Sequence, residues 1–262
     1  MKVEKNQKNA KLTFLKTKIF FMIIEICCTS KTSLSNAING GASRLEICEN
    51  LLEDGLTPSS KFLKDVIDQT TIPAHVLIRP RSGNFFYSKQ EVKKIEDQIE
   101  MAKSLGAHGI VMGALNQDYS LALSTLKNWV KMAHPLDLTF HRAFDRICQP
   151  RESLKRIIDL GFDRVLTSGQ QSTAIEGLDL LVDLQKIAKE QIVIMPGGGI
   201  NNQNCELFFK AGFHEIHLSA KGRRKTEDGE PISDLKMIKK VVTSASKLGL
   251  NAKGLLIDSF SN

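Results

Sequence analysis

Short apolar runs alternate with longer amphipathic segments along most of the chain, starting near Phe21. The apolar runs predict buried strands, and the segments between them, with apolar residues three and four positions apart, predict helices. Eight strands are predicted, at residues 23–27, 44–48, 74–80, 109–115, 137–142, 164–168, 192–196 and 215–219. The predicted helices include residues 60–69, 90–105, 120–133, 150–160, 177–189, 203–211 and 235–248.

Three of these helices are followed by a glycine, Gly106, Gly161 or Gly212, and a strand begins within four residues of each. Glycine is favoured there because the residue after a helix often takes a left-handed conformation. Regular alternation of strand and helix indicates a parallel sheet, and eight units in about 200 residues fit a (β/α)₈ barrel. A doubly wound open sheet is the alternative, but the Gly-rich turn typical of it does not follow Cys27. We predict an α/β fold, a single-domain (β/α)₈ barrel.

The two ends of the chain differ from this pattern. Residues 1–20 are rich in Lys and Asn and predict a disordered basic extension, residues 21–250 form the predicted barrel domain, and residues 251–262 form a C-terminal tail. Residues 222–230 are predicted to be a polar loop. The apolar run 19–24 is too short for a membrane span or a secretory signal and has no small-residue cleavage site. We therefore expect a soluble protein with no membrane contact.

The net charge of +7 changes this picture little, because it belongs to the two ends. Residues 1–20 carry +5 and residues 221–262 carry +4, which leaves −2 for the body of the chain. A body without basic excess argues against nucleic-acid binding. The five cysteines are odd in number and widely spaced and include no C-x-x-C, so we expect reduced thiols in the cytoplasm, without a disulfide framework or a structural zinc site.

The first two predicted strands end in similar patterns, Ile-Glu-Ile-Cys and Leu-Glu-Ile-Cys. Because side chains alternate along a strand, Glu25 shares a face with Cys27, and Glu46 shares a face with Cys48. Neighbouring strands are about 4.8 Å apart, so two thiolates at matching ends could bind one soft ion such as Cu(I). Two buried, inert cysteines are the alternative.

A second group of polar residues follows the third, fifth and sixth strands. His141, Arg142 and Asp145 lie within five residues and could combine acid–base catalysis with anion binding, or Arg142 and Asp145 could form an ion pair that holds the loop. Arg79 and Arg81 are expected at the same end of the barrel, and so is Ser168 after the sixth strand. We predict that these three residues bind an anion together with Arg142. His75 is predicted to be a satisfied histidine of the core.

The last two strands are followed by small residues. Gly197, Gly198 and Gly199 expose backbone N–H groups after the seventh strand, and Ser219 follows the eighth. Many (β/α)₈ barrels bind a phosphate at this position. We therefore predict that these residues bind an anion.

Taken together, the segments IEIC, GGASRLEIC, GLTPS, PAHVLIRPRSGNFFYS, LTFHRAFD, GFDRVLTSG, IEGL and IVIMPGGGI resemble the copper-homeostasis CutC family from about Met22 to Ser219. The resemblance implies a TIM-barrel fold, a cytoplasmic location, a homo-oligomer (dimer or tetramer) and Cu(I) bound by Cys27 and Cys48. The chain departs from the family pattern where Cys28-Thr29 replaces the usual Val-Asp, and where Ser82 and Asn84 replace Gly and Asp in the arginine loop. Cys28 could join a metal site or pack outward.

Two functions follow from these residues. The first is a cytoplasmic copper(I)-binding protein whose partner is the copper ion. The alternative is a TIM-barrel enzyme acting on a small anionic metabolite, such as a phosphorylated one, with Glu25, Glu46, His141 and Asp145 as hypothetical catalytic groups. A metal-dependent nuclease, reported for family members, is a further alternative. The sequence leaves open whether the protein is an enzyme.

Overall fold

The structure, a computed structural model, describes residues 22–248. The basic extension predicted for residues 1–20 and the tail predicted for residues 251–262 lie outside the described residues. Among the described residues, no helix is long and apolar enough to cross a membrane.

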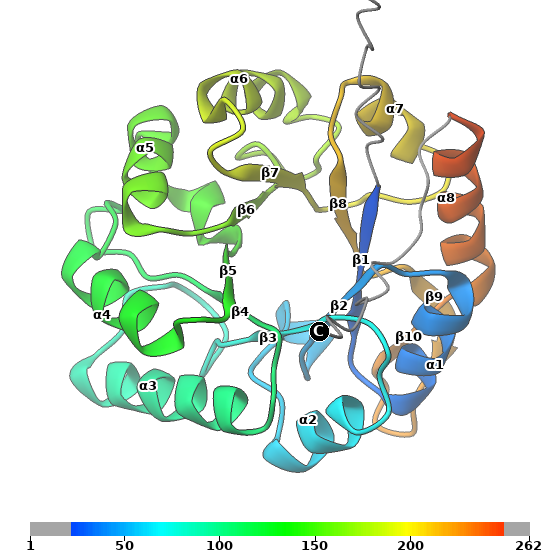
Figure 1. The fold of residues 1–262 in the computed structure, drawn as a ribbon, viewed down its shortest axis with the longest axis horizontal. Coiled ribbons are helices and arrows are strands. Elements are labelled where there is room, and N and C mark those ends of the chain that lie inside the picture. Colours follow the sequence, from blue (N-terminus) through cyan, green and yellow to red (C-terminus); the bar gives the residue numbers. More distant parts are fainter. Residues whose placement is uncertain (1–21, 249–262) are drawn as a thin grey trace, which may run out of the picture.

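Eight parallel strands form a ring in the centre of the molecule, and the helices lie around it (Figure 1). Neighbouring strands pair in the order β7-β6-β5-β4-β3-β2-β1-β8, and a bridge between Gly197 and His217 brings β7 and β8 together to close the ring. The predicted (β/α)₈ barrel is confirmed. Its strands are β1 (Ile23–Cys28), β2 (Arg44–Ile47), β3 (Ala74–Leu77), β4 (Gly109–Met112), β5 (Asp137–Phe140), β6 (Arg164–Thr167), β7 (Val193–Pro196) and β8 (Glu215–Leu218).

The helices follow the strands and cover the outside of the ring. Gly106, Gly161 and Gly212 have φ values of 87°, 90° and 87°, so each takes the left-handed conformation expected after a helix. The helices are α1 (Lys31–Gly40), α2 (Ser60–Ile67), α3 (Lys89–Ser104), α4 (Leu123–Ala133), α5 (Pro150–Leu160), α6 (Leu178–Ala188), α7 (Cys205–Lys210) and α8 (Leu235–Lys247), with short 3₁₀ segments at Leu51–Glu53 and Arg142–Arg146.

The structure corrects the prediction of a polar loop at residues 222–230. Strands β9 (Lys221–Lys225) and β10 (Pro231–Ser233) pair there as an antiparallel hairpin, so only the tip between them is a loop. The hairpin is tied to the barrel where Ser233 Oγ donates to the carbonyl of Cys27 at 3.3 Å and Asn36 donates to the carbonyl of Ser233 at 2.8 Å. Its strand β9 was unrecognised because its side chains are mostly exposed and carry no alternating apolar pattern.

The core has two layers, one outside and one inside the ring of strands. The outer layer packs the strands against the helices and includes large buried residues such as Trp129, Phe140 and Phe208. The inner layer contains a small apolar cluster of Cys27, Cys48, Leu77 and Val111. Because strand side chains alternate, each strand supplies both layers, which explains why its residues are buried on both faces.

Candidate metal and ligand site

The carboxyl ends of the strands surround a pocket with a volume of about 840 Å³. In (β/α)₈ barrels this end carries the loops that form functional sites. Glu25, Arg81, Ser168 and Gly197 do not line the pocket. The other ten predicted site residues do, and they are Cys27, Glu46, Cys48, Arg79, His141, Arg142, Asp145, Gly198, Gly199 and Ser219.

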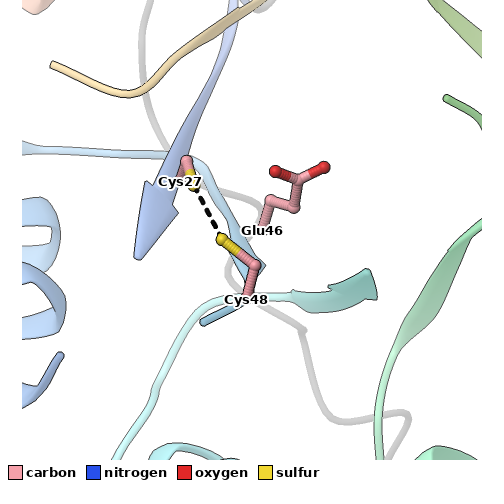
Figure 2. A group of neighbouring side chains, drawn as sticks. All are labelled: Cys27, Glu46 and Cys48. Atoms are coloured by element: carbon pink, nitrogen blue, oxygen red, sulfur yellow. Dashed lines mark hydrogen bonds between the residues drawn. The ribbon is translucent and has the colours of Figure 1, made fainter. Parts of the chain in front are cut away.

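Cys27 and Cys48 face each other from the adjacent strand ends of β1 and β2 (Figure 2). Their Sγ atoms are 3.1 Å apart, and both side chains are buried free thiols. The parallel register explains this contact, because it pairs Cys27 with Glu46 and so places Cys48 two residues further along the neighbouring chain segment, on the same face. The repeated Glu-Ile-Cys pattern therefore does bring two soft ligands together.

Both thiols hold their protons more tightly than an exposed cysteine does. The hydrogen bond with Cys48 and burial raise the pKa of Cys27 well above its usual value. The hydrogen bond from Cys27 lowers the pKa of Cys48, but burial and the Glu46 carboxylate outweigh it, so the pKa of Cys48 is also raised. A metal that binds as a thiolate complex must therefore displace protons from this pair.

Glu46 is the third potential ligand of this group. Its carboxylate and the two sulfur atoms all lie within 4.8 Å of one another. Burial raises the pKa of Glu46. A carboxylate prefers hard cations whereas thiolates prefer soft ones, so the sulfur pair is the part of this group that suits Cu(I).

Cys28 does not join the thiol pair. It belongs to the outer core, on the opposite face of β1 from Cys27, and its Sγ lies 3.6 Å from the carbonyl oxygen of Ile26. Of the two possibilities that the sequence left open, the structure shows that Cys28 packs outward.

Five charged residues form what we call the charged floor, deeper in the barrel than the thiols. Arg44 donates hydrogen bonds to Glu25 and, at 2.6 Å, to Glu215. Arg164 contacts Glu215 at 3.3 Å and Asp137 at 3.2 Å. Each arginine thus lies between two carboxylates. Glu25, a predicted catalytic group, is fully buried and has its charge compensated here.

His217 links the charged floor to the pocket and was not identified from the sequence. Its Nδ1 lies 2.8 Å from Glu25 and its Nε2 lies 3.7 Å from Glu46. Burial lowers the pKa of His217, but the Glu46 and Glu25 carboxylates outweigh it and raise the pKa. Burial acts to raise the pKa of Glu25, yet Arg44 and His217 hold it well below its usual value. The available signal was that His217 shares a strand face with Ser219, a predicted site residue.

The residues Glu25, Glu46 and His217 form a second group whose ligand atoms lie within 4.8 Å of one another. A metal there would compete with Arg44, which already pairs with Glu25. Such a pairing satisfies the buried carboxylate without a metal. Of the two groups, the thiol pair is therefore the better candidate for holding a metal ion.

His141 and Arg79 bring hydrogen-bond donors to the pocket. Nδ1 of His141 accepts a hydrogen bond from Ala143 N at 3.2 Å, so a neutral imidazole carries its proton on Nε2. Arg79 donates to three backbone carbonyls. Within residues 22–248, His141 Nε2 and Arg79 Nε have no hydrogen-bond partner. Burial and the charge of Arg79 lower the pKa of His141 to about 3, so the imidazole is neutral at pH 7 and donates through Nε2 because Nδ1 is an acceptor.

Asp145 holds the loop after β5 to the loop after β6. It accepts hydrogen bonds from Arg142 Nε at 2.8 Å, from Ser168 N and Oγ at 3.0 Å, from Thr167 Oγ1, and from Gln170 N at 3.1 Å. Arg142 and Asp145 thus form an ion pair, which is the alternative to a catalytic role for these residues. Arg142 also donates from Nη2 to Ser168 Oγ at 2.9 Å, which fixes its guanidinium beside the pocket.

The sequence placed Arg81 beside Arg79, but only Arg79 lines the pocket. Arg81 pairs with Glu91 at the start of α3 and donates to the carbonyls of Asn84 and Phe86 at 2.9 and 2.8 Å. It therefore organises its own loop. His75 is buried as predicted, yet its Nδ1 has no partner among the described residues, so it is not fully satisfied.

The glycines after β7 allow the chain to pass close to its neighbours. A Cβ atom at Gly197 would lie 2.4 Å from Cδ1 of Leu166, and one at Gly198 would lie 3.2 Å from Cβ of Ser168. Gly198 and Gly199 have φ values of 107° and 76°, which L-residues rarely adopt. Glycine is thus required both for space and for conformation.

Comparisons with known proteins agree with this architecture. The chain is 46% identical over 207 residues to the family protein CutC of Pasteurella multocida, covering 79% of this chain and 85% of that protein. It is 44% identical over 203 residues to the copper homeostasis protein cutC homolog of Mus musculus, covering 77% and 75%. A crystal structure of CutC from Streptococcus agalactiae superposes with a TM-score of 0.72 at 29% identity, covering 76% of this chain and 99% of that one. A sequence model of the CutC family matches residues 22–222, and the chain therefore belongs to the CutC family.

Proposed function

We propose that this protein binds one Cu(I) ion between Cys27 and Cys48 and acts in copper homeostasis. The observation that carries the proposal is the contact of two buried free thiols, 3.1 Å apart, at the mouth of the barrel. Thiolates are the side chains that select Cu(I). The name of the mouse relative, a copper homeostasis protein, supports the same function.

Binding requires the two side chains to move apart. Metal–sulfur bonds are about 2.3 Å long for zinc, so two thiolates on opposite sides of an ion of similar size are roughly 4.6 Å apart. The sulfur atoms must therefore separate by about 1.5 Å from their 3.1 Å contact. Cys27 lies in β1 and Cys48 directly follows β2, and both line the pocket, so side-chain rotation can supply this movement.

The proposal includes a cytoplasmic location and a homo-oligomer, either a dimer or a tetramer. Reduced thiols are maintained in the cytoplasm, and Cys27, Cys28, Cys48, Cys148 and Cys205 are all free. The oligomer is proposed from the family resemblance, and sedimentation equilibrium of the full chain tests it.

An anaerobic Cu(I) titration against a competing chelator tests the proposed site. We expect tight one-to-one binding by the parent protein and loss of tight binding in the Cys27→Ser/Cys48→Ser double variant. Cys28→Ser is the matched control for a buried thiol and Cys148→Ser for an exposed one, and both should bind like the parent. X-ray absorption of the copper complex should show two sulfur ligands. Equal affinity in the parent and the double variant would refute the site.

A further inference from the structure

The pocket is much larger than a metal ion requires. Its volume of about 840 Å³ lies within the range of roughly 300–1,000 Å³ found for sites that bind small organic molecules. The thiol pair lies on one part of its lining, and the loops after β5, β7 and β8 form another part. The pocket therefore has room for a small organic molecule in addition to a copper ion.

The loop after β7 offers three consecutive backbone donors to this pocket. Gly198, Gly199 and Ile200 all line it, and their N–H groups make no hydrogen bond within residues 22–248. The N–H of Gly197, in contrast, is used by the carbonyl of Thr167 at 2.9 Å. Successive N–H groups in left-handed and turn conformations form concave sites that attract anions.

A fixed positive charge lies next to these donors. The guanidinium carbon of Arg142 would be 3.5 Å from a Cβ atom on Gly198, so the arginine lies directly over the loop. Its Nε and Nη2 are held by Asp145 and Ser168, while Nη1 makes no hydrogen bond within the described range. An arginine fixed in this way retains donors for a phosphate or carboxylate.

A further observation, independent of the glycine loop and Arg142, concerns two buried side chains that line the same pocket. His141 and Arg79 are 96% and 94% buried, line the pocket and carry nitrogens without partners among the described residues. A buried donor without a partner costs about 1–3 kcal/mol, so such groups usually have a ligand or a water to bind. Both groups are donors in the folded protein, and they therefore fit an acceptor oxygen.

We propose that the open end of the barrel binds a small organic phosphate, with the phosphate on the N–H groups of Gly198, Gly199 and Ile200 and the guanidinium of Arg142. The remainder of the molecule presents an acceptor oxygen to Nε2 of His141. Phosphate fits better than carboxylate because several donors converge there, and a phosphate has three terminal oxygens to accept them. The contacts do not involve Cys27 or Cys48, so the inference goes beyond copper binding.

Amide NMR of the copper-free, reduced full chain tests the proposal. Inorganic phosphate, glycerol phosphate and acetate are titrated at constant ionic strength, because salt screens exposed charges. We expect saturable shifts of the Gly198, Gly199 and Ile200 amides with both phosphates, and tighter binding of glycerol phosphate. Absence of saturable shifts at these amides, or equal affinity for acetate, would overturn the proposal.

Variants distinguish the phosphate contact at Arg142 from the acceptor-oxygen contact at His141. Arg142→Gln is expected to raise the Kd for inorganic phosphate at least about tenfold, and Ser219→Glu, which adds a negative charge at the neighbouring strand end, should have a similar effect. Arg151→Gln, at an exposed ion pair on α5, is the control and should bind like the parent. His141→Phe should weaken glycerol phosphate and leave inorganic phosphate unchanged. Parent-like binding by Arg142→Gln and Ser219→Glu, or equal effects of His141→Phe on both ligands, would contradict the assignment.

Discussion

Acidification is expected to destabilise the barrel through His141. Burial and the charge of Arg79 lower its pKa to about 3, whereas an unfolded histidine has a pKa of about 6.5. At pH values between these two pKa values, His141 is protonated in the unfolded chain but not in the folded chain. The free energy of unfolding therefore falls as the pH falls below about 6.5. For these two pKa values the loss from pH 7 to pH 5 is on the order of 2 kcal/mol.

Urea unfolding of the parent and of His141→Gln at pH 7 and pH 5 measures this effect. The substitution itself changes stability at both pH values, so the relevant quantity is the difference between the two. We expect the parent to lose about 2 kcal/mol more than the variant on acidification. His134→Gln, which replaces an exposed histidine outside the pocket, should behave like the parent. An equal loss in the parent and His141→Gln would refute the reasoning.

Three further predictions concern the charged floor, the glycine loop and the thiols. Arg44→Met should lower the free energy of unfolding by about 3–5 kcal/mol, because Glu25 and Glu215 lose their shared cation; a loss below about 1 kcal/mol in urea unfolding would contradict the ion-pair network. Gly197→Ala should cost about 1–3 kcal/mol, because the new methyl group would meet Leu166 at 2.4 Å, and unchanged stability would show that this contact relaxes freely. The affinity for Cu(I) should fall about 100-fold for each unit decrease in pH, because the raised pKa values of both thiols mean that two protons are released on binding. Chelator competition at pH 7 and pH 6 measures this, and a tenfold change or less would show that only one thiolate is formed.

Much of the fold could be predicted because the barrel strands are buried on both faces. A strand such as Gly109–Met112 is a short apolar run between helices, and a glycine such as Gly161 marks the end of the preceding helix. The thiol pair could be predicted because Cys27 and Cys48 end consecutive strands, which are neighbours in the sheet. Helix α1 was not identified because it is rich in small polar residues, and its ends depend on the Ser30 cap and on Gly41.

The interior contacts of the pocket were harder to predict. His217 contacts Glu25 because β1 pairs with β8, although the two residues are 192 positions apart. No local sequence pattern indicates that these two strands are neighbours. The role of Asp145 likewise depends on donors from the loop after β6, including Ser168. Sequence spacing places a residue at a strand end, but it does not say whether its polar atoms are already used by neighbours.

The charged floor restricts which substitutions the barrel can accept during evolution. Glu215 shares Arg44 with Glu25 and shares Arg164 with Asp137, so the loss of one member leaves an opposite charge without its partner on another strand. Compensation for such a loss has to come from a second substitution on that other strand. These positions should therefore covary among related sequences, whereas exposed positions on the helices drift independently. Selection would therefore act jointly on these five residues, although they lie on five separate strands.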